Sequence, residues 1–488
     1  MSALTALVLA VLCQPIPQNP VPVGPGPTAA PAGSAAAFAT HFEDRVLRID
    51  LFHTGRAGEE FASVDRIRTE GQWPGNKARL IDGTGLGLYR VVVRDASTDT
   101  VLYTQGFCSV FGEWVTTDEA KLPGRRTFAE AVRIPEPKAP IVLALEKRDA
   151  RQQFVEWFRT TIDPKSLVIE RQKPVNQDVL VIVERGDPSS HVDLLLLGDG
   201  YTAAEKGAFR ADAERLVRAL FATEPYKTHA GKFNVRAIAP PSPKSGISKP
   251  RQGEWRQSAL GATFNTFDSD RYVLLQDDRR WRDVAAAAPY DTVVVLLNER
   301  KYGGGGIFRL YSTAAARSEV SEYLFVHEFG HSFAALADEY FTSPVAYSEF
   351  TPPQVEPWET NVTALLDPAQ LKWKDLVKAD TPLPTPWDKD AFTTLSKQFQ
   401  QRRADLVAKG AKDEELEALF AEEKAATKQL LDAELARHSI GAYEGAMYQA
   451  RGLYRPEVDC VMFSRNRNEF CAVCARSIER VIEELTAR

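Results

Sequence analysis

The segment His327-Glu328-Phe329-Gly330-His331 combines residue types that can bind a metal ion and move a proton. On an α-helix, two histidines four residues apart lie on one face, so both imidazoles can bind the same ion. Glu328 is then placed to accept a proton from a water molecule that the metal activates. Because the chain has only 7 histidines, we favour a catalytic zinc site over two histidines packed in a core helix.

Two histidines leave a zinc site one protein ligand short. A metzincin would continue with a glycine and a third histidine, but Ala334 and Ala337 stand at those positions. We expect Asp338 to be the third ligand, with Glu339 as the alternative, because zinc accepts carboxylate oxygen. Glu349 is a later candidate. The helix must bend or end before Asp338, and no glycine marks that point.

The elements around this segment predict an α/β domain over residues 176–488. Apolar runs typical of buried strands occur at Val179–Val183, Leu194–Leu197, Phe233–Ala239 and Thr292–Leu297. Thr202 can cap a helix that runs to about Thr223. Residues 388–437 are long, charged and helix-prone, with a break at 408–412, and we interpret them as an inserted helical hairpin with solvated charged faces.

Residues 38–175 show short alternating segments instead, which predict an antiparallel β-sandwich without catalytic residues of its own. The predicted strands are Arg48–Phe52, Gly87–Arg94, Thr100–Phe107 and Ile141–Lys147. The turn signal Asp95–Asp99 separates two of them.

Residues 1–37 are interpreted as a signal peptide followed by a Pro/Ala-rich spacer, since no charged residue occurs before position 41. A lipid anchor at Cys13 is the alternative, although Leu12 stands where a small residue is usual. Either way we expect an exported protein: secreted, periplasmic or on the cell surface. Among Cys108, Cys460, Cys471 and Cys474 we expect a disulfide whose pairing is open; a structural zinc site is the rival and has no evident fourth ligand nearby.

Composition argues against two classes of protein, nucleic-acid binders and integral membrane proteins. The chain has 488 residues, 44% hydrophobic and 26% charged, and a net charge of −6, so we expect no nucleic-acid partner. No apolar run long enough to span a bilayer occurs beyond the N-terminus, so we expect no integral membrane segment other than a signal or anchor there.

Several motifs resemble the IgA-peptidase family of bacterial zinc metallopeptidases. The resemblance is strongest at His327–Tyr340 and extends to Leu194–Thr202, Tyr454–Pro456, Cys460–Met462 and Phe470–Cys474. It spans most of residues 179–488, and the N-terminal block is similar to the β-rich domain that precedes the peptidase in this family.

The resemblance implies a metzincin-like fold, one catalytic zinc ion and endopeptidase activity on proteins or peptides. It also implies that His327 and His331 bind the zinc ion, that Glu328 is the general base and that Met462 forms a Met-turn below the ligands. Specificity for IgA belongs to the family's name and is not transferred.

Two further features are candidates for the site. Gly303, Gly304, Gly305 and Gly306 follow a predicted strand and either let an extended peptide pair with an edge strand or form a surface loop. Tyr448 and Tyr454 are favoured as packed aromatics, with a hydrogen bond to the oxyanion as the alternative.

The sequence therefore predicts a secreted zinc endopeptidase. The alternatives are a zinc hydrolase of non-peptide substrates and a surface- or glycan-binding protein with a degenerate peptidase domain.

Overall fold

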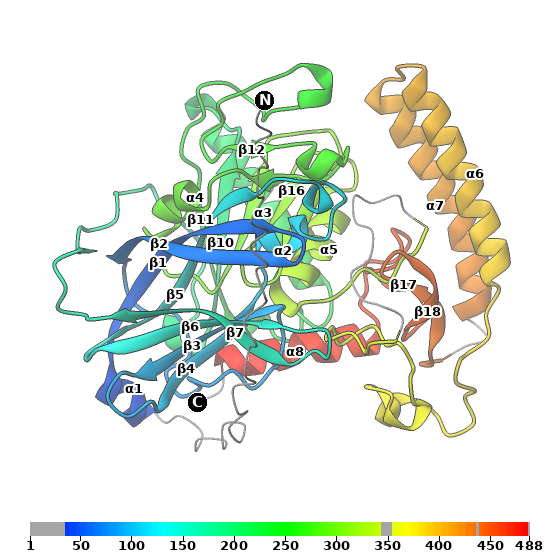
Figure 1. The fold of residues 1–488 in the computed structure, drawn as a ribbon. Helices are drawn as coiled ribbons and strands as arrows, with labels where there is room; N and C mark the ends of the chain where they lie inside the picture. Colours follow the sequence, from blue (N-terminus) through cyan, green and yellow to red (C-terminus); the bar gives the residue numbers. More distant parts are fainter. Residues whose placement is uncertain (1–34, 343–353, 436–438, 487–488) are drawn as a thin grey trace, which may run out of the picture. The chain divides into compact units, whose positions relative to one another are not determined.

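The computed structural model describes residues 35–342, 354–435 and 439–486 (Figure 1). A short helix, α1 (Ala35–His41), opens the described chain. Nearly all of the predicted signal peptide and spacer lies outside these residues, as does Glu349.

Two four-stranded sheets form the N-terminal β-rich region, in the orders β5-β1-β2-β8 and β4-β3-β6-β7. Their strands are β1 (Phe42–Arg56), β2 (Glu59–Thr69), β3 (Tyr89–Asp95), β4 (Val101–Phe107), β5 (Arg126–Pro137), β6 (Ile141–Arg148), β7 (Phe154–Ile162) and β8 (Ile169–Glu170). All neighbours are antiparallel except β2 and β8. Leu47 and Ile49 of one sheet share a buried cluster with Val91 and Val93 of the other, so the two sheets pack face to face.

A six-stranded sheet is the centre of the C-terminal part, in the order β15-β16-β14-β10-β11-β9. Its strands are β9 (Leu180–Val183), β10 (Val192–Asp199), β11 (Phe233–Ile238), β14 (Thr292–Leu297), β15 (Gly304–Ile307) and β16 (Tyr311–Ala315). The four inner strands are parallel, and both edge strands run antiparallel to their neighbours. Every residue of β10 and β14 is buried, which explains the apolar runs Leu194–Leu197 and Val293–Leu297.

Helices cover both faces of this sheet: α3 (Lys206–Ala222), α4 (Asp278–Ala285), α5 (Ser321–Ala334) and α8 (Ala472–Thr486). The helices α3, α5 and α8 share a cluster with Leu194 and Leu196, whereas α4 packs with Leu195 and Leu197 on the other face. The alternation of strands and helices is thus the mixed α/β architecture that the sequence predicts.

Two long helices, α6 (Lys389–Ala408) and α7 (Asp413–Leu435), occupy the segment predicted as a helical hairpin (Figure 1). Gly410 lies between them with a φ of 70°, a conformation that suits glycine after a helix end. The remaining elements are α2 (Val110–Trp114), β12 (Ala262–Thr263), β13 (Leu274–Leu275), β17 (Tyr443–Ala446) and β18 (Gln449–Arg455).

Arg48 of β1 connects the β-rich region to α4. Its guanidinium is fully buried and forms ion pairs with Asp50 and Glu70, each at 2.8 Å, and with Asp283 of α4. Asp283 also pairs with two arginines of β2. Burial by itself would lower the pKa of Arg48, but the carboxylates of Glu70 and Asp50 raise it above its ordinary value. The side chain therefore stays charged.

We expect Arg48→Met to destabilise the protein by about 3 kcal/mol, because buried carboxylates would lose a cation. Arg125→Met is the matched control: it removes an exposed pair with Glu59 and should leave stability nearly unchanged. Urea unfolding followed by circular dichroism measures both, and equal effects of the two substitutions would contradict the role of Arg48.

Candidate active site

Helix α5 carries both predicted histidine ligands and is buried along nearly its whole length. The Nδ1 atom of His327 lies 2.9 Å from the carbonyl oxygen of Val461, and that of His331 lies 2.5 Å from the carbonyl oxygen of Leu336. A carbonyl oxygen only accepts a hydrogen bond, so each Nδ1 carries the proton. Each Nε2 therefore keeps its lone pair for a metal ion.

The turn that follows α5 explains how a carboxylate returns to these histidines. The helix ends at Ala334, and Ala335 adopts a left-handed conformation with φ 54° and ψ 34°. The N–H of Ala335 donates to the carbonyl of His331 at 3.0 Å. Glycine is the usual residue at such a helix end, so an alanine in its place hides the turn from a sequence-based prediction.

This turn places the Asp338 carboxylate against the histidine pair. Its Oδ1 lies 3.2 Å from the Nε2 atoms of both His327 and His331, and the two nitrogens are 3.2 Å apart. Ligands about 2.0–2.1 Å from a tetrahedral zinc ion are roughly 3.3–3.4 Å apart, so the triangle has the size of a zinc-ligand set. Asp338 Oδ1 is buried and has no hydrogen-bond partner among the described residues.

The charges of the triangle also favour a cation at its centre. Burial would lower the pKa of His331, but the Asp338 carboxylate raises it to about 9. Burial would raise the pKa of Asp338, yet His331 and His327 hold it well below its usual range. Both shifts have one cause, the contact between the Asp338 carboxylate and the two imidazoles. The three residues therefore fit a zinc ion, and three protein ligands leave a fourth position for water or substrate.

Glu328 lies beside the histidines and lines the same cavity. One of its carboxylate oxygens is within 4.8 Å of a ring nitrogen of each histidine. Burial raises the pKa of Glu328 above its ordinary value, although His327 and His331 oppose the shift. A carboxylate with a raised pKa is suited to take up a proton and to release it.

The glycine run lies on β15, an edge strand that packs against α5. A Cβ atom on Gly304 would lie 3.3 Å from Glu328 Oε1, and one on Gly306 would lie 2.8 Å from His331 Cβ. These glycines therefore let strand and helix approach closely, which is a role that the sequence did not suggest.

The outer side of β15 is partly paired already. The N–H of Gly304 donates to the carbonyl of Arg271 at 3.0 Å, and the N–H of Val273 donates to the carbonyl of Gly304 at 3.2 Å. An extended peptide could thus add to this edge only from Gly305 onward. Gly303 does not line the cavity, whereas the next three glycines do.

Tyr448 and Tyr454 occupy different environments. The hydroxyl of Tyr448 lines the cavity and donates to Oδ2 of Asp338, which leaves Oδ1 directed at the histidines. Tyr454 does not line the cavity. Tyr448 is thus placed to orient the third candidate ligand.

Met462, the residue predicted to form a Met-turn, packs against α5. Its side chain is fully buried, and its sulfur would be 3.1 Å from a Cβ atom on Gly330. The Met462 carbonyl accepts from the N–H of Glu339 at 2.9 Å, which ties this segment to the loop that carries Asp338.

The cavity beside α5 has a volume of about 310 Å³ and takes its walls from distant parts of the chain. Phe399 and Arg403 of α6 and Phe420 of α7 line it, so one face of the helical pair is not the solvated surface that the sequence suggested. Cys108 and Glu113 of the β-rich region also line it.

Two family models match the chain. The one described as IgA Peptidase M64 matches residues 180–482, and the one described as Peptidase M64 N-terminus matches residues 37–159. The chain belongs to this peptidase family. The match confirms the resemblance inferred from the motifs and identifies a peptidase, whose substrates are proteins or peptides. No curated protein matches the chain significantly.

Within this family member, the cysteines differ from expectation. Cys108, Cys460, Cys471 and Cys474 are all free thiols, so the predicted disulfide is not formed among the described cysteines. Glu339, the alternative third ligand, lies beside Cys460, Cys471 and Cys474 instead of the histidines. Its Oε1 lies 3.1 Å from the Cys474 sulfur. The sequence offered no fourth ligand for a structural zinc site at these cysteines, because Glu339 lies more than a hundred positions before Cys460.

Among the described residues, no helix combines the length and the apolar character needed to cross a membrane.

We expect Tyr448→Phe to weaken zinc binding by roughly 10–100-fold, because Asp338 would lose the donor that orients it. Tyr454→Phe is the control and should bind zinc as the wild type does. Competition with a chromophoric chelator measures both affinities. Unchanged zinc affinity together with a lower kcat in Tyr448→Phe would instead assign its hydroxyl to the oxyanion.

Proposed function

We propose that this protein is an exported zinc-dependent endopeptidase with a metzincin-like catalytic domain. The observation that carries the proposal is the triangle of His327, His331 and Asp338, whose three donor atoms lie 3.2 Å apart. Membership in a peptidase family supports the class of reaction. The buried Met462 beneath α5 supports the metzincin-like fold, and α6 with α7 would be an insert that walls the substrate cavity.

Zinc held by these three residues would lower the pKa of water to about 7 and polarise the scissile carbonyl. Glu328 accepts the proton of the attacking water and returns it to the nitrogen of the leaving amine. Val461 and Leu336 keep the imidazoles oriented through their carbonyl oxygens. A cavity of about 310 Å³ accommodates a few residues of an extended chain, which runs along β15 beyond Gly304.

Export is supported by the uncharged apolar N-terminal segment and its Pro/Ala-rich spacer within residues 1–37. N-terminal sequencing of the mature protein from culture medium, periplasm and membranes tests it. A protein that retains Met1 in the cytoplasm would contradict export.

We expect Glu328→Gln to lower kcat/KM by about 10²–10⁴-fold while zinc content stays unchanged, because the amide cannot accept the proton. Glu423→Gln is the matched control, since Glu423 lines the same cavity from α7 and has no proposed part in proton transfer. Internally quenched peptides and unfolded proteins serve as substrates. An active Glu328→Gln enzyme would exclude the general-base role.

The same assay separates the alternatives. Zinc-loaded protein that hydrolyses small esters or amides and no peptide would be a hydrolase of another class. Zinc-loaded protein that hydrolyses neither, and binds glycans or cell surfaces, would be a degenerate peptidase.

Removing zinc with a chelator should abolish hydrolysis and lower the midpoint of thermal unfolding, because a ligand that binds only the folded state stabilises it. Differential scanning calorimetry with and without chelator measures the shift, and re-addition of zinc should restore both properties. Full activity after metal removal, verified by elemental analysis, would contradict the proposed chemistry.

A further inference from the structure

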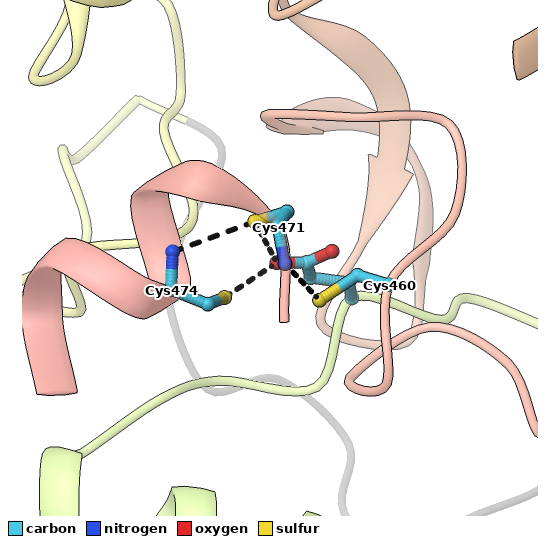
Figure 2. A group of neighbouring side chains, drawn as sticks. Cys460, Cys471 and Cys474 are labelled. Atoms are coloured by element: carbon cyan, nitrogen blue, oxygen red, sulfur yellow. Dashed lines mark hydrogen bonds between the residues drawn. The ribbon is translucent and has the colours of Figure 1, made fainter. Parts of the chain in front are cut away.

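Three thiols and a carboxylate meet in a second cluster, which has no part in the proposed hydrolysis. It consists of three neighbouring cysteines, Cys460, Cys471 and Cys474 (Figure 2), and of Glu339. All four residues are buried. One ligand atom of each residue lies within 4.8 Å of those of the other three. None of the four lines the cavity beside α5.

The distances within the cluster have the scale of a metal site. Oε1 of Glu339 lies 3.1 Å from the sulfur of Cys474 and 3.8 Å from that of Cys471. A sulfur about 2.3 Å and an oxygen about 2.0 Å from a tetrahedral zinc ion are roughly 3.5 Å apart, between these two values. Thiolate sulfur selects soft or borderline ions such as zinc over magnesium or calcium.

Glu339 brings a buried carboxylate to the cluster, and a cation bound at its Oε1 would neutralise that charge. The residue is fully buried, and its Oε1 accepts a hydrogen bond from Asn361 at 3.0 Å. Its Oε2 is buried without a hydrogen-bond partner in the described chain. Burying a carboxyl group with one oxygen unpartnered costs folding free energy unless a charge or a ligand compensates it. A disulfide would use two of the sulfurs and leave this carboxyl uncompensated.

The surroundings of the sulfurs favour thiolates. The sulfur of Cys460 accepts from the N–H groups of Cys471 at 3.2 Å and Met462 at 3.5 Å, and the sulfur of Cys471 accepts from the N–H of Cys474 at 3.4 Å. Cys471 immediately precedes α8 and Cys474 lies in its first turn, where the positive end of the helix dipole stabilises an anion. Arg455 is fully buried and acts electrostatically on Glu339 and Cys460, so it offsets part of their negative charge.

We infer that Cys460, Cys471, Cys474 and Glu339 form a closed structural zinc site. Four protein ligands complete a tetrahedron and leave no position for substrate, as in structural sites elsewhere. The site joins three segments: the loop after α5 through Glu339, the Met462 segment through Cys460, and the start of α8 through the other two cysteines. Asp338 and Glu339 are adjacent, so one loop supplies a ligand to each of the two zinc sites.

The experiment compares the zinc content of the full-length protein with that of two single-site variants. Elemental analysis after zinc loading and dialysis should find two ions per wild-type chain and one in each of His331→Ala and Cys474→Ser. Cys108→Ser is the matched control, since Cys108 is a thiol outside the cluster, and it should keep both ions. A wild type with a single ion that Cys474→Ser retains would overturn the inference.

X-ray absorption at the zinc edge of His331→Ala keeps the test independent of how well Cys474→Ser folds. This variant retains the whole cluster, so its remaining zinc should show mainly sulfur neighbours at about 2.3 Å. A shell of nitrogen and oxygen only would overturn the inference. A disulfide between any two of the three cysteines would also overturn the inference. Peptide mass analysis detects it after the zinc-loaded protein has been unfolded and alkylated without reductant.

Glu339→Gln tests the oxygen ligand separately, because glutamine preserves the size of the side chain and removes its charge. We expect it to weaken retention of the sulfur-bound zinc, measured as loss of that ion to a chelator, while zinc remains at the histidines. Unchanged retention would remove Glu339 from the ligand set and overturn the four-ligand site.

Discussion

The C-terminal part is organised around three atoms with lone pairs: Nε2 of His327, Nε2 of His331 and Oδ1 of Asp338. Each lies 3.2 Å from the other two. They repel each other unless a cation lies between them, so the surrounding chain must hold each one in place. The carbonyl of Val461 holds the imidazole of His327, and the carbonyl of Leu336 holds that of His331. The Tyr448 hydroxyl holds the Asp338 carboxylate. Every one of these partners lies outside α5, so the helix alone does not make the site.

The close approach of α5 and β15 is the second requirement. Gly304 and Gly306 leave no side chain between strand and helix, so Glu328 and His331 can lie directly beside the edge of the sheet. The same edge is partly occupied by Arg271–Val273, which limits how an extended peptide can pair with it. The close packing of β15 against α5 therefore depends on these glycines.

The walls of the cavity come from regions that are remote in sequence. The α6–α7 pair and the segment after β4 in the β-rich region both contribute lining residues, and the buried ion pairs around Arg48 connect that region to α4. The second cluster, at Cys460, Cys471, Cys474 and Glu339, lies outside this cavity and joins the loop after α5 to α8.

The sequence by itself determined the elements whose signal is local. Apolar runs predicted four of the six strands of the central sheet, and alternation predicted the β-rich region. The spacing of His327 and His331 placed both imidazoles on one helical face, with Glu328 next to the first. Only the tertiary structure showed that Asp338 returns to the histidines, because the turn depends on a left-handed alanine where glycine is usual. Only the tertiary structure brought Glu339 to the cysteines and α6 with α7 to the cavity, since contacts between distant segments depend on how the elements pack and leave no local pattern in the chain.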